Sequence, residues 1–214
     1  MRAFVVAFVT SATLLVAHPA PAQEPPPRIS LFVVDLHATV PRFPQDVQLA
    51  QSRGMLLAEL PGSGLGLQAG VHVYPLRWRA ITFGVGGEFT IGRARQTPTA
   101  TETNVRPATE QLTTIAPQLS FNFGNGNGWS YISGGVGPST WAVVPSGQEG
   151  FAADSERLKT LNYGGGARWF MKSHLAFSFD VRFYAIAPGT PFFAGAPGSP
   201  RTTLVVIGAG ISVK

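Results

Sequence analysis

The chain has 214 residues, of which 44% are hydrophobic and 13% are charged, and its formal net charge is +5. It contains no cysteine, which excludes a disulfide scaffold and a lipidated cysteine after export. Its basic residues are dispersed along the chain and do not form the clustered basic face of a nucleic-acid-binding protein. We therefore expect no nucleic-acid partner.

The first residues have the layout of a secretory signal peptide. Arg2 provides positive charge, residues 4–17 form an uncharged apolar run, and Ala20-Pro21-Ala22 offers small residues at a cleavage site. The run is shorter than the ~20 residues that a membrane-spanning helix needs. We predict a signal peptide over residues 1–22 with cleavage after Ala22, an extended proline-rich lead-in over 23–28, and one domain over 29–214.

Segments in which apolar and polar residues alternate recur along the mature chain. In residues 175–185, leucine, phenylalanine and valine occupy one face, and serine, aspartate and arginine occupy the other. This period of two is typical of a β-strand with two unlike faces. The predicted strands are 30–40, 65–74, 80–91, 115–123, 129–143, 160–170, 175–185 and 203–213. Helical periodicity is not evident in the mature chain, so the fold class is predicted to be all-β.

Long and short connections between the predicted strands alternate strictly. The long connections are 41–64, 92–114, 144–159 and 186–202, and the short ones are 75–79, 124–128 and 171–174. Antiparallel neighbours joined in this way place every long loop at one end, as in barrels of the outer membrane. The sequence therefore predicts an eight-stranded antiparallel up-and-down transmembrane β-barrel, with both chain ends on the side of the short turns.

Alternation alone does not decide which face of the barrel meets lipid. A soluble lipocalin-like barrel that binds a lipophilic ligand has the same period with its apolar face inward. Small residues on the polar face favour a narrow, polar lumen instead, because an eight-stranded barrel leaves little space inside. These are Gly66, Gly70, Gly84, Gly86, Gly164, Gly166, Gly208 and Gly210.

Aromatic residues near the short turns also favour a barrel in lipid. We predict that they form an interfacial rim, because amphipathic rings settle where a membrane meets water. The predicted rim is Tyr74, Trp78, Trp129, Tyr131 and Trp169.

The polar faces carry charged residues that we interpret as a structural cluster inside the barrel. Charges in a narrow lumen need partners, and opposite charges on the neighbouring sixth and seventh strands can pair. The predicted cluster is Asp35, His37, His72, Glu88, Arg168, Asp180 and Arg182. No nucleophile–base pair or metal-ligand spacing stands out, so we expect no catalytic residues, metal or cofactor.

Two stretches resemble the OmpA/OmpX-like outer-membrane β-barrel family. Residues 163–184, YGGGARWFMKSHLAFSFDVRFY, join a glycine-rich strand, an aromatic pair, a tight turn and a strand that ends in charged and aromatic residues. Residues 83–89, FGVGGEF, look similar. The resemblance implies a membrane barrel without a wide pore that acts as an anchor, adhesin or surface protein. The final Ile211-Ser212-Val213-Lys214 departs from the aromatic ending of many members, and no peptidoglycan-binding domain is expected.

Together these observations predict a non-enzymatic, monomeric barrel in the cell outer membrane, with a filled lumen and surface-exposed loops. Its expected partners are membrane lipid and a surface ligand of the long loops. Two alternatives stay open from the sequence: the soluble lipocalin-like barrel and a lipid-modifying outer-membrane enzyme.

Overall fold

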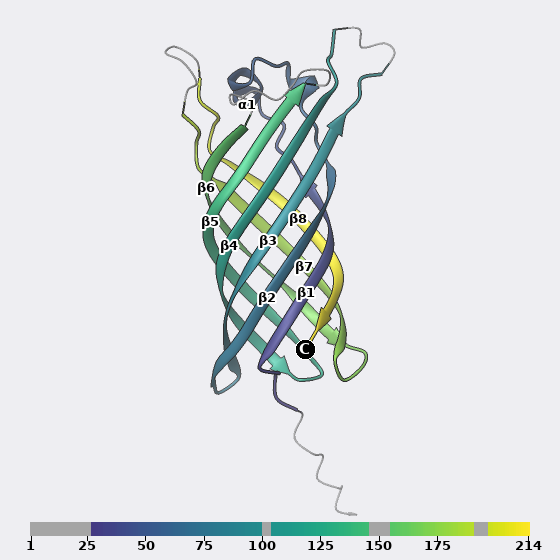
Figure 1. Cartoon of the computed structure of the whole chain (residues 1–214), viewed down its shortest axis with the longest axis vertical. Coiled ribbons are helices and arrows are strands. Elements are labelled where there is room, and N and C mark those ends of the chain that lie inside the picture. Colours follow the sequence, from purple (N-terminus) through teal and green to yellow (C-terminus); the bar gives the residue numbers. More distant parts are fainter. Residues whose placement is uncertain (1–26, 100–103, 146–154, 191–196) are drawn as a thin grey trace, which may run out of the picture.

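The computed structural model describes residues 27–99, 104–145, 155–190 and 197–214. The predicted signal peptide and most of the proline-rich lead-in lie outside the described residues. Eight antiparallel strands form a closed barrel in which each strand pairs with the next and the last pairs with the first (Figure 1). This confirms the predicted fold class. The strands are β1 (Phe32–Arg42), β2 (Gly64–Trp78), β3 (Ile81–Gln96), β4 (Ala108–Asn125), β5 (Gly128–Pro145), β6 (Ser155–Phe170), β7 (Leu175–Ile186) and β8 (Thr202–Val213).

The two ends of the barrel differ in their connections, as predicted. The end that carries the connections β1–β2, β3–β4, β5–β6 and β7–β8 is called the loop end. The other end, called the turn end, carries the short turns, and the carboxyl terminus lies there (Figure 1).

Several strands extend further toward the loop end than the sequence predicts. The pairing of β3 with β4 continues to Gln96 opposite Ala108, although residues 92–114 were predicted to be a connection. In this part of the sheet Arg93 and Arg95 point outward, whereas Ala94 is buried inside. Beyond the apolar part of the barrel, charged residues therefore point outward and apolar residues point inward. The sequence of this part does not have the pattern of a lipid-facing strand.

The β1–β2 connection contains helical structure that the sequence analysis did not predict. The helix α1 (Val47–Ser52) is followed by a 3-10 helix, η1 (Leu57–Glu59). Asp46 starts α1 by accepting hydrogen bonds from the backbone N–H groups of Gln48 and Leu49. A helix of six residues is less than two turns long, which is too short to produce a visible period of 3.6. No helix among the described residues is long and apolar enough to cross a membrane.

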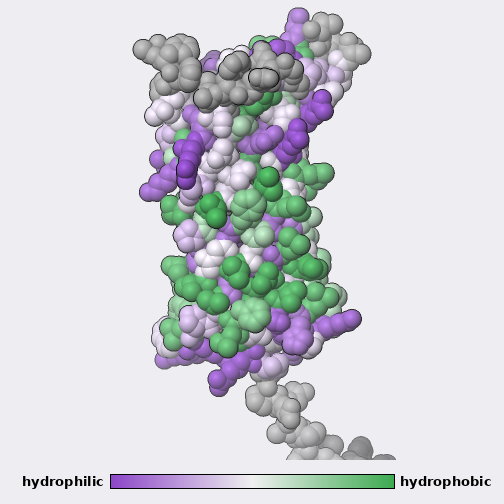
Figure 2. Space-filling model, viewed as in Figure 1, coloured by the Kyte–Doolittle hydropathy of each residue, from purple (hydrophilic) through white to green (hydrophobic). Residues whose placement is uncertain are grey.

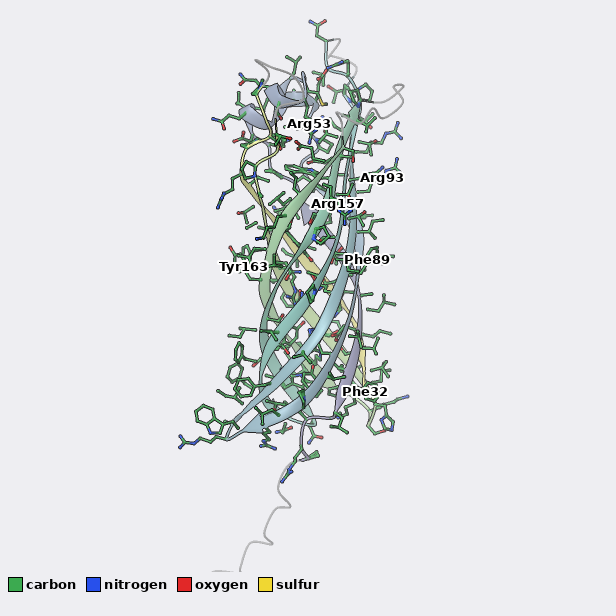
Figure 3. The ribbon with its side chains drawn as sticks, turned by 60° about the vertical axis from the view of Figure 1, so that its left-hand side comes forward. Phe32, Arg53, Phe89, Arg93, Arg157 and Tyr163 are labelled. Atoms are coloured by element: carbon green, nitrogen blue, oxygen red, sulfur yellow. The ribbon has the colours of Figure 1, made fainter. Side chains whose placement is uncertain are left out.

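A belt of apolar side chains surrounds the barrel, bordered by polar residues above and below (Figure 2). Along β6 the outward positions run from Leu161 to Trp169, which at ~3.4 Å per residue and a tilt of ~40° covers roughly 20 Å of height. In Figure 3, Phe32, Phe89 and Tyr163 project from this belt, and Arg93 and Arg157 lie nearer the loop end. The exposed large apolar strand residues are Phe32, Val34, Leu36, Val40, Leu65, Leu67, Val71, Val73, Leu76, Trp78, Val85, Phe89, Ile91, Ile115, Leu119, Phe121, Phe123, Ile132, Val136, Leu161, Tyr163, Trp169, Phe177, Phe179, Ile207, Ile211 and Val213.

Candidate functional site

The lumen is the candidate site, because it gathers most of the buried polar residues of the described chain. All members of the predicted interior cluster are buried there. They come from five strands that face one another across the barrel axis. Asp35 and His37 lie on β1, His72 on β2, Glu88 on β3, Arg168 on β6, and Asp180 and Arg182 on β7.

One ion pair crosses the lumen between strands that are not neighbours. The Arg168 guanidinium donates from Nε and Nη2 to the two carboxylate oxygens of Asp35, at 2.8 and 2.6 Å. The Ser212 hydroxyl donates to the same carboxylate at 2.5 Å, and the guanidinium lies 4.0 Å from the ring centre of Tyr131. The bidentate geometry and the aromatic contact fix the Arg168 side chain across the barrel.

A second group of charges lies around Arg182. Its Nε is 2.9 Å from the Asp180 carboxylate on the same strand and 3.0 Å from the Glu88 carboxylate on β3. Tyr131 donates to Asp180 at 2.5 Å, and Tyr184 donates to Glu88 at 2.7 Å. The carboxylates are thus held by tyrosines as well as by the arginine.

The pairing predicted between the sixth and seventh strands is wrong. Arg168 on β6 bonds to Asp35 on β1, and Asp180 on β7 bonds to Arg182 beside it on the strand. An arginine side chain is long enough to reach across a narrow lumen, so its partner need not lie on a neighbouring strand.

Glycines on the inward face make room for the long side chains. A Cβ atom at Gly84 would lie 2.8 Å from the ring of Tyr74, and one at Gly166 would lie 2.8 Å from the Tyr131 hydroxyl. Larger residues at these positions would collide with the rings. The predicted role of small residues in a crowded lumen therefore matches the packing around these two glycines.

Toward the loop end the lumen is filled by apolar residues, called here the loop-end cluster. Leu49 and Leu60 of the β1–β2 connection enter it from above, and α1 lies over this end of the barrel (Figure 1). Trp141 is fully buried and donates from its indole N–H to Glu110 at 2.7 Å. The cluster is Phe43, Leu49, Ala50, Met55, Leu60, Ala94, Ala108, Leu112, Trp141, Val143, Tyr184, Ile186, Leu204 and Val206.

Ion pairs hold the connections together above this cluster. Arg53 pairs with Glu156 at 2.7 Å, and Ser199 donates to the same carboxylate at 2.6 Å. Glu59 accepts from the Arg106 side chain at 2.9 and 3.0 Å. These hydrogen bonds from Arg106 lower the pKa of Glu59 to about 2, against the opposing effect of its burial. The β1–β2 connection is thereby linked to the β3–β4 connection through Arg106 and, by way of Glu156 on β6, to Ser199 of the β7–β8 connection.

At the turn end a small cluster of aromatic and aliphatic residues, the turn-end cluster, fills the lumen. It consists of Val33, Tyr74 and Trp129, with Ile29 and Phe170 packed against it. The Trp129 and Phe170 rings stack with their centres 4.9 Å apart.

The predicted aromatic rim is wrong for three of its members. Tyr74, Trp129 and Tyr131 are buried in the lumen, each no more than 5% exposed. Their strand positions have the parity of the inward residues, and this parity decides the face, whatever the distance to a turn. The other two members, Trp78 and Trp169, are exposed on the outer face near the turn end.

The structure brings together a serine and a histidine that the sequence analysis did not connect. The Nε2 atom of His37 lies 2.7 Å from the Ser178 hydroxyl. Both residues lie opposite Gly210 of β8, which has no side chain to separate them. Strand pairing across β8 would have been needed to foresee this contact. His37 and Ser178 are fully buried, and the His37 Nδ1 atom has no hydrogen-bond partner among the described residues.

Nothing in the described lumen is arranged to hold a metal ion, since histidine, aspartate and glutamate do not gather there in groups of metal-binding geometry. The buried carboxylates bond instead to arginine, tyrosine, serine and glutamine. The charged groups of the network are thus paired with one another, whereas some buried hydroxyls, such as those of Tyr74 and Ser133, have no partner among the described residues.

The fold agrees with the comparisons to known proteins. Residues 7–212 match the outer membrane protein beta-barrel domain family, and the chain belongs to this family. It is therefore an outer-membrane β-barrel protein. Comparison with curated proteins gives no match.

Two solved structures show the similarity of the fold. Neisserial surface protein A has a TM-score of 0.57 and 15% identity, with 86% of this chain and 97% of that chain covered. Ail, the attachment invasion locus protein of Yersinia pestis, in complex with the heparin analogue sucrose octasulfate, has a TM-score of 0.53 and 11% identity. That alignment covers 85% of this chain and 96% of the Ail chain.

Proposed function

We propose that the protein is a non-enzymatic, monomeric component of the outer membrane whose lumen is closed to ions and solutes. The observation that carries this proposal is the filling of the lumen in three layers. The loop-end cluster, the charged network of Asp35, Arg168 and Arg182, and the turn-end cluster follow one another along the axis. The free-energy cost of removing these charges from water is offset only because each charge has a partner in place.

We further propose that the protein acts through the loop end, which presents the long connections to the outside of the cell. The relatives with the same fold include a surface protein and an attachment protein, and one of them was solved with a heparin analogue. A ligand on the cell exterior is consistent with the position of these connections.

Two alternative functions receive less support. A soluble lipocalin-like barrel would keep its apolar face inward, whereas the apolar strand residues here are exposed and the lumen is polar. A lipid-modifying enzyme would need a reachable nucleophile, whereas Ser178 and His37 are fully buried.

Conductance in planar bilayers tests the closed lumen. The full-length protein is expected to give no stable current under conditions in which a general porin, as the control, conducts. Large and stable currents from the purified protein would contradict the proposal. The enzyme alternative is tested separately by comparing lipid A acylation in cells with and without the gene, where we expect no difference.

A further inference from the structure

Among the described residues, the charged side chains that point outward from the strands are all basic. At the loop end six exposed cations without an ion pair among the described residues lie above the apolar belt, and Figure 3 shows two of them, Arg93 and Arg157. A seventh exposed cation, Arg106, pairs with Glu59. Among the acidic residues that the structure describes, only Asp46 is exposed, and it caps α1. The remaining described carboxylates lie inward, where they have partners. The outward cations at the loop end are Arg42, Arg93, Arg95, Arg157, Lys159 and Arg201.

Two of these cations border a groove in the outer surface. The groove has a volume of about 340 Å³, and Lys159 and Arg201 are at its edge. Its apolar lining includes Val136, Leu161 and Ala185 of three consecutive strands. Neither Lys159 nor Arg201 forms an ion pair with another residue that the structure describes.

A second apolar groove continues from the first toward the turn end. It has a volume of about 580 Å³ and is lined along the same three strands by Gly134, Tyr163 and Phe183. These residues are two positions further along β5, β6 and β7 than the lining of the first groove. Tyr163 and Phe183 stack with ring centres 5.3 Å apart and form one wall, and glycine leaves the floor open.

We propose that this stripe on β5, β6 and β7 is a binding site for an anionic, phosphate-bearing lipid of the leaflet next to the loop end. Its phosphate contacts Lys159 and Arg201, and one acyl chain lies in the two apolar grooves below them. The cations sit at the height where a lipid headgroup meets the apolar belt, and the grooves run into the belt where the chains lie. A soluble phosphate would gain nothing from the grooves, and a neutral lipid would gain nothing from the cations. The inference rests on the outer face and is independent of whether the lumen conducts.

Native mass spectrometry of the full-length protein released from detergent micelles tests the site. The probes are phosphatidylglycerol, phosphatidylcholine with the same chains, and inorganic phosphate. In the variant Lys159→Ala/Arg201→Ala we expect the affinity for phosphatidylglycerol to fall about tenfold or more, because both cations that attract the anionic headgroup are lost. The matched control is Arg93→Ala/Arg95→Ala, which removes the same charge at the loop end from β3, outside both grooves.

A second variant separates the headgroup from the chain. Val136→Ser/Leu161→Ser removes apolar lining and keeps both cations, and we expect it to weaken phosphatidylglycerol binding as well. The proposal would be overturned if Lys159→Ala/Arg201→Ala and Arg93→Ala/Arg95→Ala lost the same affinity for phosphatidylglycerol. It would also be overturned if the unchanged protein bound phosphatidylcholine as strongly as phosphatidylglycerol. If millimolar inorganic phosphate displaced the lipid, the site would bind the headgroup without the acyl chain. This result would also overturn the proposal. The positions are exposed, and circular dichroism verifies that each variant is folded.

Discussion

The ion pair between Arg168 and Asp35 illustrates what a charge costs inside this barrel. Both side chains are almost fully buried, so each has lost its water. The attraction between them offsets this loss only while both are present, and a buried pair is therefore weak in itself but costly to break. The Ser212 hydroxyl and the Tyr131 ring supply the additional contacts that such a pair needs.

Removing one partner should therefore destabilise the barrel more than removing both. We predict that Asp35→Ala lowers the free energy of unfolding by about 3–5 kcal/mol, since Arg168 is left as an unpaired buried charge. The double variant Asp35→Ala/Arg168→Met should recover most of the loss. Urea unfolding of the protein in lipid vesicles measures both. A double variant as unstable as the single one would contradict this reasoning.

At the level of single residues, strand parity predicts the inward face and little else. The interior positions of Asp35, Glu88 and Arg182 follow from alternation. Their partners depend on which strands face one another across the lumen and on the reach of each side chain, which no local pattern encodes. The aromatic rim shows the same limit, because proximity to a turn does not override the inward parity of Tyr74 and Trp129.

Among the elements, the β1–β2 connection helps to close the loop end of the lumen. It places Leu49 and Leu60 into the loop-end cluster, where both are fully buried. Its own hydrogen bonds and the pairs Arg53–Glu156 and Glu59–Arg106 keep it folded over the barrel. The buried residues of this connection pack against inward residues of the barrel strands, such as Leu112 and Trp141.

Shortening a buried side chain of this connection should loosen it. We predict that Leu60→Ala reduces the local stability by about 2–5 kcal/mol, because the cavity that it leaves lies within the loop-end cluster. Leu56→Ala, at an exposed position of the same connection, is the control and should stay within about 0.5 kcal/mol. Trypsin cleavage after Arg53 in the folded protein measures the difference. Equal cleavage rates in the two variants would argue against a packed cap.

The Glu59–Arg106 pair predicts a pH dependence for the same connection. The pKa of Glu59 is lowered to about 2 in the folded protein, so the contribution of the pair is complete above about pH 4.5 and is lost as the pH falls toward 2. The backbone N–H groups of Leu56 and Arg106 donate to this carboxylate, and their NMR shifts should titrate with a midpoint near 2. Glu59→Gln should abolish the titration. A midpoint near 4.5 would show that the pair is not formed in solution.

The number and order of the strands are predictable from alternation and connection length, whereas their ends are not. Near the loop end the inward residues become apolar and the outward ones become charged, as at Ala94 between Arg93 and Arg95. When the apolar and polar residues exchange faces within one strand, the alternation is interrupted, and the sequence there looks like the start of a loop. The short helix α1 is missed for a different reason, since its six residues are held by a cap and by packing rather than by periodicity.

For the molecule as a whole, the apolar belt sets how deeply the barrel sits in lipid. Leu119 is 61% exposed within the belt, whereas Gln111 on the same strand is exposed beside the loop-end cations. We predict that Leu119→Arg costs about 2–4 kcal/mol and Gln111→Arg about 0–1 kcal/mol, because the penalty for a charge decreases with distance from the bilayer centre. Urea unfolding in phosphatidylcholine vesicles compares them. Similar costs for the two variants would place the belt elsewhere on the barrel.

The bonds inside the barrel also constrain the order in which it folds. Several of them join the beginning of the chain to its end: Ser212 and Arg168 both bond to Asp35, and Ser178 bonds to His37, across 177, 133 and 141 residues. Contacts between such distant parts of a chain form late, because the loop-closure entropy must be overcome first. These bonds therefore form only when the last strand, β8, pairs with β1 and closes the barrel. Asp35→Ala should accordingly speed unfolding and leave the rate of folding nearly unchanged, which stopped-flow measurements in detergent micelles can determine.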